Sequence, residues 1–210
     1  TESSGGSVNS RIEPDGTKRP YELNATWYDL IRGDTADEHA LDRHLASHAI
    51  MLALQGIPAV YVQSLFAGHN DHDAVARTGA ARSINRHRYD DVDDLETQLA
   101  DPTTTTARSV TGLKQMLTWR RSSSAFHPDA DQSVLPTPEE VLGIERTHVD
   151  GSVARVFVNV SDSQVIVHGS GNTTTRGWRF AAEGDVLRLG PYGIAWVFDA
   201  SGPEGRRDGG

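Results

Sequence analysis

Hydrophobic positions in the first half of the chain recur at helical spacing in two segments. Between residues 37 and 55 they follow one another at steps of three and four, and Gly56 ends the pattern. Residues 109–121 show the same spacing and end in two arginines, which suit a helix C-terminus. We therefore predict two amphipathic helices, with a shorter one at residues 92–99 inside the long polar loop between them.

A short apolar run follows the first predicted helix. Residues 57–62 read Ile-Pro-Ala-Val-Tyr-Val between Gly56 and a polar stretch, which is typical of a strand buried on both faces. A helix, a tight turn and a buried strand together predict an α/β unit. Residues 1–20 are rich in turn-forming residues and are expected to be a loop.

The pattern changes near residue 124. Short β-rich runs separated by turn signals occupy residues 141–147, 153–160, 164–168, 177–181, 186–189 and 193–198. We expect an α/β part over residues 1–123, a small antiparallel β-sandwich-like domain over residues 124–200, and a disordered tail over residues 201–210.

Composition excludes several classes of function. The net charge is −9, and the tight basic run at residues 82–88 is flanked by aspartates, which argues against nucleic-acid binding. No apolar run reaches the length of about 18 residues that a membrane-spanning helix needs. The chain has no cysteine, so a disulfide, a cysteine nucleophile and a thiolate metal site are excluded, and a cytoplasmic location is expected.

Three stretches of the sequence carry a resemblance to a known family. They are PYELNATWY at residues 20–28; GIPAVY, GHND and ARSINRH at residues 56–61, 68–71 and 81–87; and AFHP at residues 125–128, followed by the β-rich tail. In this order they resemble the sucrose phosphorylase branch of the α-amylase superfamily of glycoside hydrolases. The resemblance extends from about residue 4 to residue 198.

This resemblance implies a fold and a reaction. The fold is the C-terminal end of a (β/α)8 TIM barrel with a β-domain behind it. The reaction is a retaining one: a carboxylate attacks the anomeric carbon of an α-glucoside, a second carboxylate protonates the leaving oxygen, and inorganic phosphate then takes the glucosyl unit as α-glucose 1-phosphate. The family's catalytic carboxylates lie on earlier strands, so we assign no catalytic residue here, expect no cofactor, and expect this segment alone to be inactive.

The same resemblance assigns candidate binding residues. Arg82 matches the arginine that reaches the glucosyl unit. Asn70 and Asp71 follow the expected strand at the end where barrel enzymes build their sites, although a capping or Asx-turn role explains them equally well. Tyr21 and Glu22 match an acceptor-site loop in which sucrose phosphorylases tend to have Tyr-Gln. A carboxylate facing that site would repel phosphate, so this departure from Tyr-Gln argues against sucrose as the substrate. It fits a relative with an acceptor other than fructose, such as glycerate or glycerol, and the identity of the acceptor stays open.

Alternative interpretations remain at this point. A hydrolase of the same superfamily differs only in the second acceptor, and the β-rich half is also compatible with a non-catalytic carbohydrate-binding module. We assign no metal site. His44 and His48 have chelating spacing on the predicted helix but lack a third ligand, so both are expected on the helix surface. The Asn-Asp motif accounts for the surroundings of His69 without a metal.

The resemblance also yields a prediction about stability. Taken without the rest of a barrel, residues 60–62 would lie on an unpaired edge, so the 210-residue chain should be marginally stable, with the β-domain the more independent part. In urea, far-UV circular dichroism and tryptophan fluorescence should therefore report different transitions. One sharp transition seen identically by both probes would contradict this expectation.

Overall fold

The structure is a computed structural model, which describes residues 2–33, 37–169 and 173–199. The chain forms two compact units, one containing residues 1–44 and 60–111 and the other residues 45–59 and 112–210. These units do not follow the expected boundary after residue 123, which stays a proposal about domain organisation. The expected tail at residues 201–210 lies outside the described residues.

The first unit begins with a β-hairpin where the sequence predicts a loop. After the short 3-10 helix η1 (Glu2–Ser4), β1 (Ser7–Ile12) pairs antiparallel with β2 (Lys18–Asn24), so the expectation of a loop over residues 1–20 is wrong. Gly16 supplies the positive φ, 84°, that the connecting turn requires. The sequence pattern did not predict these strands, because both faces of a two-stranded ribbon are open to solvent. Such strands need no alternation of apolar and polar residues.

Short helices make up most of the rest of this unit. They are α1 (Trp27–Ile31), α3 (Val62–Leu65), α4 (His72–Thr78), the 3-10 helix η2 (Ala81–Asn85) and α5 (Val92–Ala100). The helix predicted at residues 92–99 is therefore confirmed. At the start of α1, α4 and α5, the side chains of the N-cap residues Thr26, Asp71 and Asp91 accept a hydrogen bond from the backbone N–H of Asp29, Ala74 and Asp94 respectively.

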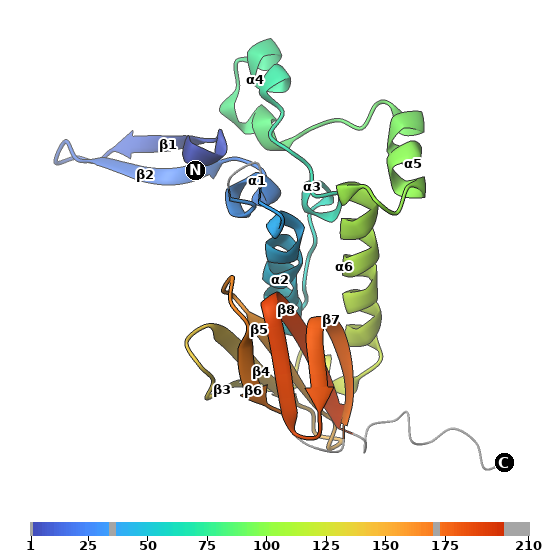
Figure 1. Cartoon of the computed structure of the whole chain (residues 1–210). Helices are drawn as coiled ribbons and strands as arrows, with labels where there is room; N and C mark the ends of the chain where they lie inside the picture. The colour runs from blue at the N-terminus through green and yellow to red at the C-terminus, as the bar shows by residue number, and fades with distance from the viewer. Residues whose placement is uncertain (1, 34–36, 170–172, 200–210) are drawn as a thin grey trace. The chain divides into compact units, whose positions relative to one another are not determined.

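Two longer helices each contain residues of both units (Figure 1). They are α2 (Ala40–Ala53) and α6 (Thr105–Arg121), and both confirm the helices predicted from the apolar periodicity. The expectation that His44 and His48 lie on the helix surface is wrong, since both are buried. The His44 ring lies inside the first unit, with Nε2 2.9 Å from the carbonyl oxygen of Ser64.

The buried strand predicted at residues 57–62 is absent. Residues 57–61 have no regular secondary structure, and the side chains of Ile57 and Tyr61 are 87% and 52% exposed. A strand buried on both faces needs a neighbour on each edge to satisfy its backbone groups. Every strand pair among the described residues is antiparallel, and none involves this segment.

The second unit contains a six-stranded antiparallel sheet (Figure 1). After η3 (Ser124–Phe126), its strands are β3 (Asp131–Leu135), β4 (Val141–Thr147), β5 (Val153–Asn159), β6 (Val165–His168), β7 (Thr173–Glu183) and β8 (Val186–Asp199). Their order is β3-β4-β5-β8-β6, and β7 also pairs with β8. The antiparallel β-rich part is confirmed. The sandwich is replaced by one curled sheet, because the two runs expected at residues 186–189 and 193–198 form a single strand.

Glycine makes this continuous strand possible. A Cβ on Gly177 would lie 1.9 Å from the carbonyl oxygen of Ile194, and one on Gly193 would lie 2.5 Å from that of Arg179. The β7 backbone can approach β8 this closely only without those side chains. Between its two halves β8 exchanges β6 for β5 as a partner, so one strand joins both parts of the sheet.

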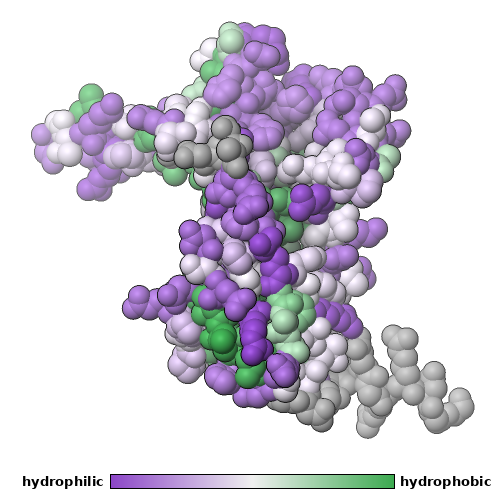
Figure 2. Space-filling model, viewed as in Figure 1, coloured by the Kyte–Doolittle hydropathy of each residue, from purple (hydrophilic) through white to green (hydrophobic). Residues whose placement is uncertain are grey.

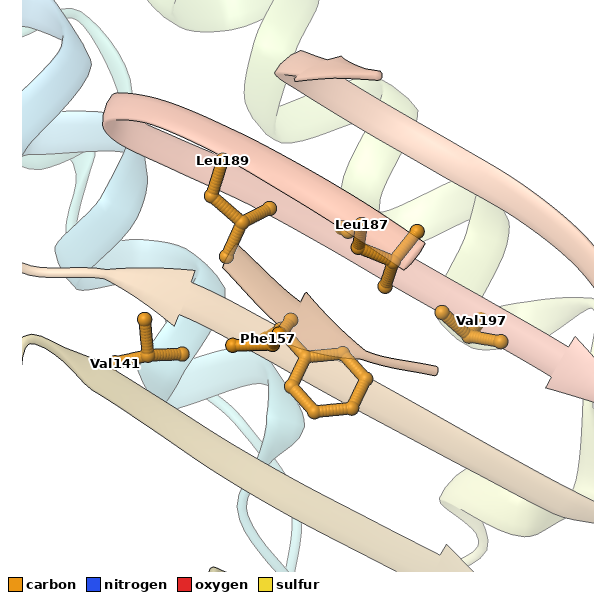
Figure 3. Packing of buried hydrophobic residues seen from close by; sticks show 7 residues of the cluster. Val141, Phe157, Leu187, Leu189 and Val197 are labelled. Atoms are coloured by element: carbon orange, nitrogen blue, oxygen red, sulfur yellow. The ribbon is translucent and has the colours of Figure 1, made fainter. Parts of the chain in front are cut away.

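The core of the second unit lies against the curled sheet. Figure 3 shows side chains from β4, β5 and β8 directed toward one another. The buried cluster comprises Val141, Phe157, Val167, Leu187, Leu189, Ala195 and Val197. The Trp196 and Phe126 rings are in contact, with their centroids 4.9 Å apart and their planes inclined at 45°. On the face seen in Figure 2, hydrophobic residues gather over the strands, whereas the surface over α4 and α5 is mainly hydrophilic. None of the described helices is long and apolar enough to cross a membrane.

Two buried arginines bind the C-terminal end of α2. Arg146, on β4, is fully buried and donates to the carbonyl oxygens of Ala53, His127, Ala130 and Asp131. Arg120 donates to Leu52 and Gly56. The last carbonyls of a helix lack intrahelical partners and carry the negative end of its dipole, so a guanidinium fork stabilises them well.

We expect Arg146→Ala to lower the free energy of unfolding of the second unit by about 3 kcal/mol, because it leaves buried carbonyl groups unsatisfied. Arg146→Lys should recover only part of this loss, since an ammonium group does not match the guanidinium fork. Urea unfolding followed by tryptophan fluorescence measures both. The control Arg188→Ala removes an exposed side chain and should change stability by less than about 0.5 kcal/mol. Equal effects of Arg146→Ala and Arg188→Ala would contradict the prediction.

Candidate functional site

Arg82 and Glu22 form an ion pair that joins two segments of the first unit. Arg82, on η2, places Nε 2.6 Å from Oε1 of Glu22, on β2. The other carboxylate oxygen accepts from the Asn9 side chain at 2.8 Å, and Asn9 is the cross-strand partner of Glu22. The hydrogen bond from Asn9 and the neighbouring Arg82 guanidinium hold the pKa of Glu22 below its usual value. Both oxygens of this carboxylate are therefore engaged within the protein.

The pairing through Nε leaves the outer edge of the Arg82 guanidinium available. Its side chain is 58% exposed, and within the described part of the chain only Nε has a hydrogen-bond partner. The terminal nitrogens of a guanidinium donate in a fixed planar fork, which suits a hydroxyl group or an oxyanion. Glu22 thus orients Arg82 without occupying the nitrogens that a ligand would use.

Tyr21, next to Glu22 on β2, lies at an irregular position of the hairpin. The ring is exposed on β2. Asn9 is paired with Glu22 and Ser10 with Pro20, so Tyr21 is the extra residue of a β-bulge and has no cross-strand partner. The structure brings Glu22 to Arg82, and the position of Tyr21 at the acceptor stays a prediction.

Asn70 connects its own segment by hydrogen bonds to α1 and to η1. Its side-chain oxygen accepts from the backbone N–H of Thr26 at 2.7 Å, and its amide nitrogen donates to the carbonyl of Ser4 at 2.9 Å. Its backbone N–H donates to Asp29 at 2.7 Å. These bonds give Asn70 a structural role, while contact with a substrate stays a prediction.

Asp71 also has a local structural role. Its Oδ1 accepts from the backbone N–H of Ala74 and caps α4, at 2.7 Å. Its Oδ2 accepts from Nδ1 of His87 at 2.7 Å. These two hydrogen bonds hold the pKa of Asp71 below its usual value, with His87 contributing most. The capping role weighed for this residue is present, and a role in binding stays a prediction.

Asp29 is the buried residue that sequence reasoning missed. It is 4% exposed and accepts from Nδ1 of His69 at 2.8 Å and from the Asn70 backbone at 2.7 Å, and it pairs with Nε of Arg32 at 2.9 Å. Burial opposes ionisation, yet the hydrogen bonds from His69 and Asn70, with the charge of Arg32, hold the pKa of Asp29 below its usual value. A carboxylate in a first helical turn after a threonine cap was the available signal, but that position usually indicates a surface residue.

A cavity of about 650 Å³ opens beside these residues in the first unit. Asn70, Asp71, His69 and His87 line it, whereas Arg82, Glu22 and Tyr21 are not among its lining residues. The five candidate residues thus fall into separate groups. Across residues 2–33, 37–169 and 173–199, the structure contains no group of three or more acidic or histidine side chains arranged to hold a metal ion.

Comparison with known proteins relates the chain to α-glucoside phosphorylases. No protein-family model matches it. A glucosylglycerate phosphorylase from Allomeiothermus silvanus is 38% identical over 93% of this chain and 34% of its own length. A sucrose phosphorylase from Streptococcus mutans is 32% identical over 68% of this chain and 27% of its own length. The chain spans about a third of the length of these relatives.

A solved structure shares the fold. The sucrose 6F-phosphate phosphorylase from Thermoanaerobacter thermosaccharolyticum matches with a TM-score of 0.59 at 24% identity, over 75% of this chain and 30% of that one. Together with the relatives described above, this match confirms the resemblance inferred from the motifs.

We expect Asp29→Asn to lower the free energy of unfolding by about 2–3 kcal/mol at pH 7, because it removes the charge that the buried donors bind. The folded-state pKa of Asp29 lies below the unfolded value of about 3.9, so its stabilisation is complete above that pH and is lost as the pH falls through the folded pKa. The difference between the two proteins should therefore shrink below about pH 4.

Urea unfolding at pH 7 and pH 3 measures this difference, and amide exchange at Asn70 places it in the first unit. The control Asp93→Asn alters an exposed carboxylate in α5 and should have little effect at either pH. A pH-independent difference for Asp29→Asn would contradict the assignment.

Proposed function

Because the chain is homologous to the sucrose phosphorylase branch of the α-amylase superfamily, we propose that it forms the C-terminal part of a retaining α-glucoside phosphorylase. The enzyme transfers a glucosyl unit from an α-glucoside to inorganic phosphate and releases α-glucose 1-phosphate. The observation that carries the proposal is the match to a glucosylglycerate phosphorylase over 93% of this chain. The reacting carboxylates come from another segment, and this chain supplies binding groups.

In this proposal Arg82 binds a hydroxyl group of the glucosyl unit through its terminal nitrogens. Glu22 supports it by holding Nε at 2.6 Å, and Asn9 fixes Glu22 in turn. Because Glu22 already holds the charged Arg82 side chain in place, this side chain loses little conformational entropy when the sugar binds. The ion pair therefore favours binding.

Glycerate is the acceptor that we propose for the reverse reaction. The glucosylglycerate phosphorylase match covers 93% of the chain, against 68% for the sucrose phosphorylase. The Glu22 carboxylate, which would repel phosphate if it stood alone, is neutralised by Arg82. We further propose that Tyr21, Asn70 and Asp71 contribute to substrate binding in the complete enzyme, with Tyr21 at the acceptor.

The proposal also accounts for the exposed segment at residues 57–61. When the neighbouring strands of a (β/α)8 barrel are supplied, Ile57 and Tyr61 gain partners on both edges and can extend into the last barrel strand. Residues 1–123 are then the end of the barrel and residues 124–200 the domain behind it. We propose a cytoplasmic enzyme that needs no cofactor. The curated relatives described above are phosphorylases, which does not favour a hydrolase or a binding module.

A chimaeric enzyme tests this proposal. In it, this chain replaces the aligned third of the Allomeiothermus silvanus glucosylglycerate phosphorylase. We expect release of glucose 1-phosphate from glucosylglycerate only when phosphate is present. Release of free glucose at the same rate without phosphate would indicate a hydrolase, and a folded chimaera without any turnover would contradict the proposal.

In the chimaera, Arg82→Ala should lower kcat/KM by about 10- to 100-fold, the cost of a lost charged hydrogen bond to the substrate. Glu22→Gln should lower it less, because the amide keeps the contact to Arg82 without the charge. The matched control is Arg121→Ala, which removes an exposed arginine at the end of α6. Circular dichroism verifies that each variant is folded. An unchanged kcat/KM for Arg82→Ala would remove Arg82 from the site.

A further inference from the structure

The helix α5 carries an exposed apolar stripe beside acidic side chains. None of its residues is buried, and the side chains of Val92 and Leu99 are 56% and 37% exposed. Glu96 lies four positions after Val92 and three before Leu99, so it shares their side of the helix. Within the described residues the Glu96 carboxylate has no hydrogen bond or ion pair. The helix therefore presents apolar surface next to an uncompensated negative charge.

The hairpin of β1 and β2 presents the complementary combination. Ile12 is 78% exposed, and its cross-strand partner is Lys18. Cross-strand partners lie on the same face of an antiparallel pair, so an exposed ammonium group stands next to an exposed apolar side chain. Among the described residues this ammonium group has no ion pair. The hairpin thus carries apolar surface next to an uncompensated positive charge.

An open groove of about 600 Å³ lies on the same face of the hairpin. Residues 8, 10 and 12 alternate with those of the other face, so the groove continues toward Ile12. Its walls come from the hairpin and from η1, and they are formed by Glu2, Ser3, Val8, Ser10, Lys18 and Pro20. A helix with an apolar stripe can lie in a groove of this kind, with its charged side chains along the rim.

The two surfaces do not meet within one copy of the chain. Figure 1 shows the hairpin and α5 on different sides of the first unit. Two copies can bring them together, because apolar side chains and opposite charges on one chain are complementary to the same features of another. A two-fold arrangement forms the contact twice, and closed two-fold dimers are the commonest form of self-association.

We propose that two copies of this chain associate in solution, with α5 of each copy in the hairpin groove of the other. Val92 and Leu99 contact the apolar residues of the groove, and Glu96 forms an ion pair with Lys18 of the second copy. The contact lies outside the cavity beside residues 63–73, and the inference does not rest on the proposed phosphorolysis.

Sedimentation equilibrium of the full 210-residue chain measures the association. We expect a monomer–dimer equilibrium that weakens as salt is added, because exposed ion pairs are screened. Lys18→Glu and Glu96→Lys should each raise the dissociation constant by about tenfold or more, since each substitution places like charges opposite one another in both contacts. A chain that stays monomeric up to about 1 mM would overturn the proposal.

An equimolar mixture of these two variants is the sharpest measurement. In a mixed pair each hairpin faces an α5 of opposite charge, so the mixture should dimerise nearly as tightly as the unaltered chain. The chain that carries both substitutions should do so as well. Recovery in the mixture also shows that neither substitution unfolds the chain. A mixture that associates no more tightly than the separate variants would overturn the pairing of Lys18 with Glu96.

Two further variants test the direction of the effect. Glu2→Gln removes the acidic group that lines the groove and opposes α5, so it should tighten the association by about two- to threefold. Lys114→Glu changes the net charge as much as Lys18→Glu does, but at an exposed lysine of α6 outside both surfaces, and should leave the dissociation constant unchanged. Equal losses in Lys18→Glu and Lys114→Glu would overturn the proposal, because they would indicate a response to net charge alone.

Discussion

The buried carboxylate of Asp29 is the interaction on which the first unit depends. A charge removed from water is tolerated only when donors surround it, and Asp29 has donors from α1 and from the segment that follows α3. Two further bonds of Asn70 extend this connection to the N-terminal segment and to the cap of α1. Short helices that bury little apolar surface are thereby held in one arrangement by hydrogen bonds rather than by a large core.

Buried positive charge has the corresponding role in the second unit. Arg146 and Arg120 bind carbonyl groups at the end of α2, while the curled sheet buries its own cluster of apolar side chains. Both units therefore use a buried ionic group to hold separate segments of the chain together. The cost of desolvating that group is offset only by the complete set of hydrogen bonds around it, which makes each arrangement specific.

Contacts between residues distant in the sequence also determine how the candidate residues are oriented. Glu22 and Arg82 are 60 positions apart in the sequence, and they meet because β2 of the hairpin and η2 lie together in the first unit. The contact turns a carboxylate that would repel phosphate into a support for an arginine. The rings of His69 and His87 are oriented in a similar way, since an aspartate binds Nδ1 of each ring.

The sequence by itself determined the features that repeat along the chain or belong to short motifs. Apolar spacing identified α2 and α6, because burial on one face leaves a period in the sequence. The length of the polar loop suggested α5, and β-rich runs between turn signals identified most strands of the sheet. The order of three motifs identified the relatives. For Asp71 the sequence allowed either a binding role or a helix-capping role, and the structure shows the cap. These inferences rest on neighbours within a few residues.

Only the tertiary structure decided the features that depend on distant partners. The apolar run at residues 57–61 has the composition of a buried strand, yet it forms none, because no strand in the described part of the chain pairs with its backbone. The hairpin of β1 and β2 forms despite lacking the usual pattern, with Glu22 bound to Arg82. Asp29, His44 and Arg146 read as surface residues by type and are buried because hydrogen-bond partners from elsewhere in the chain satisfy them. Such partners leave no local pattern in a single sequence.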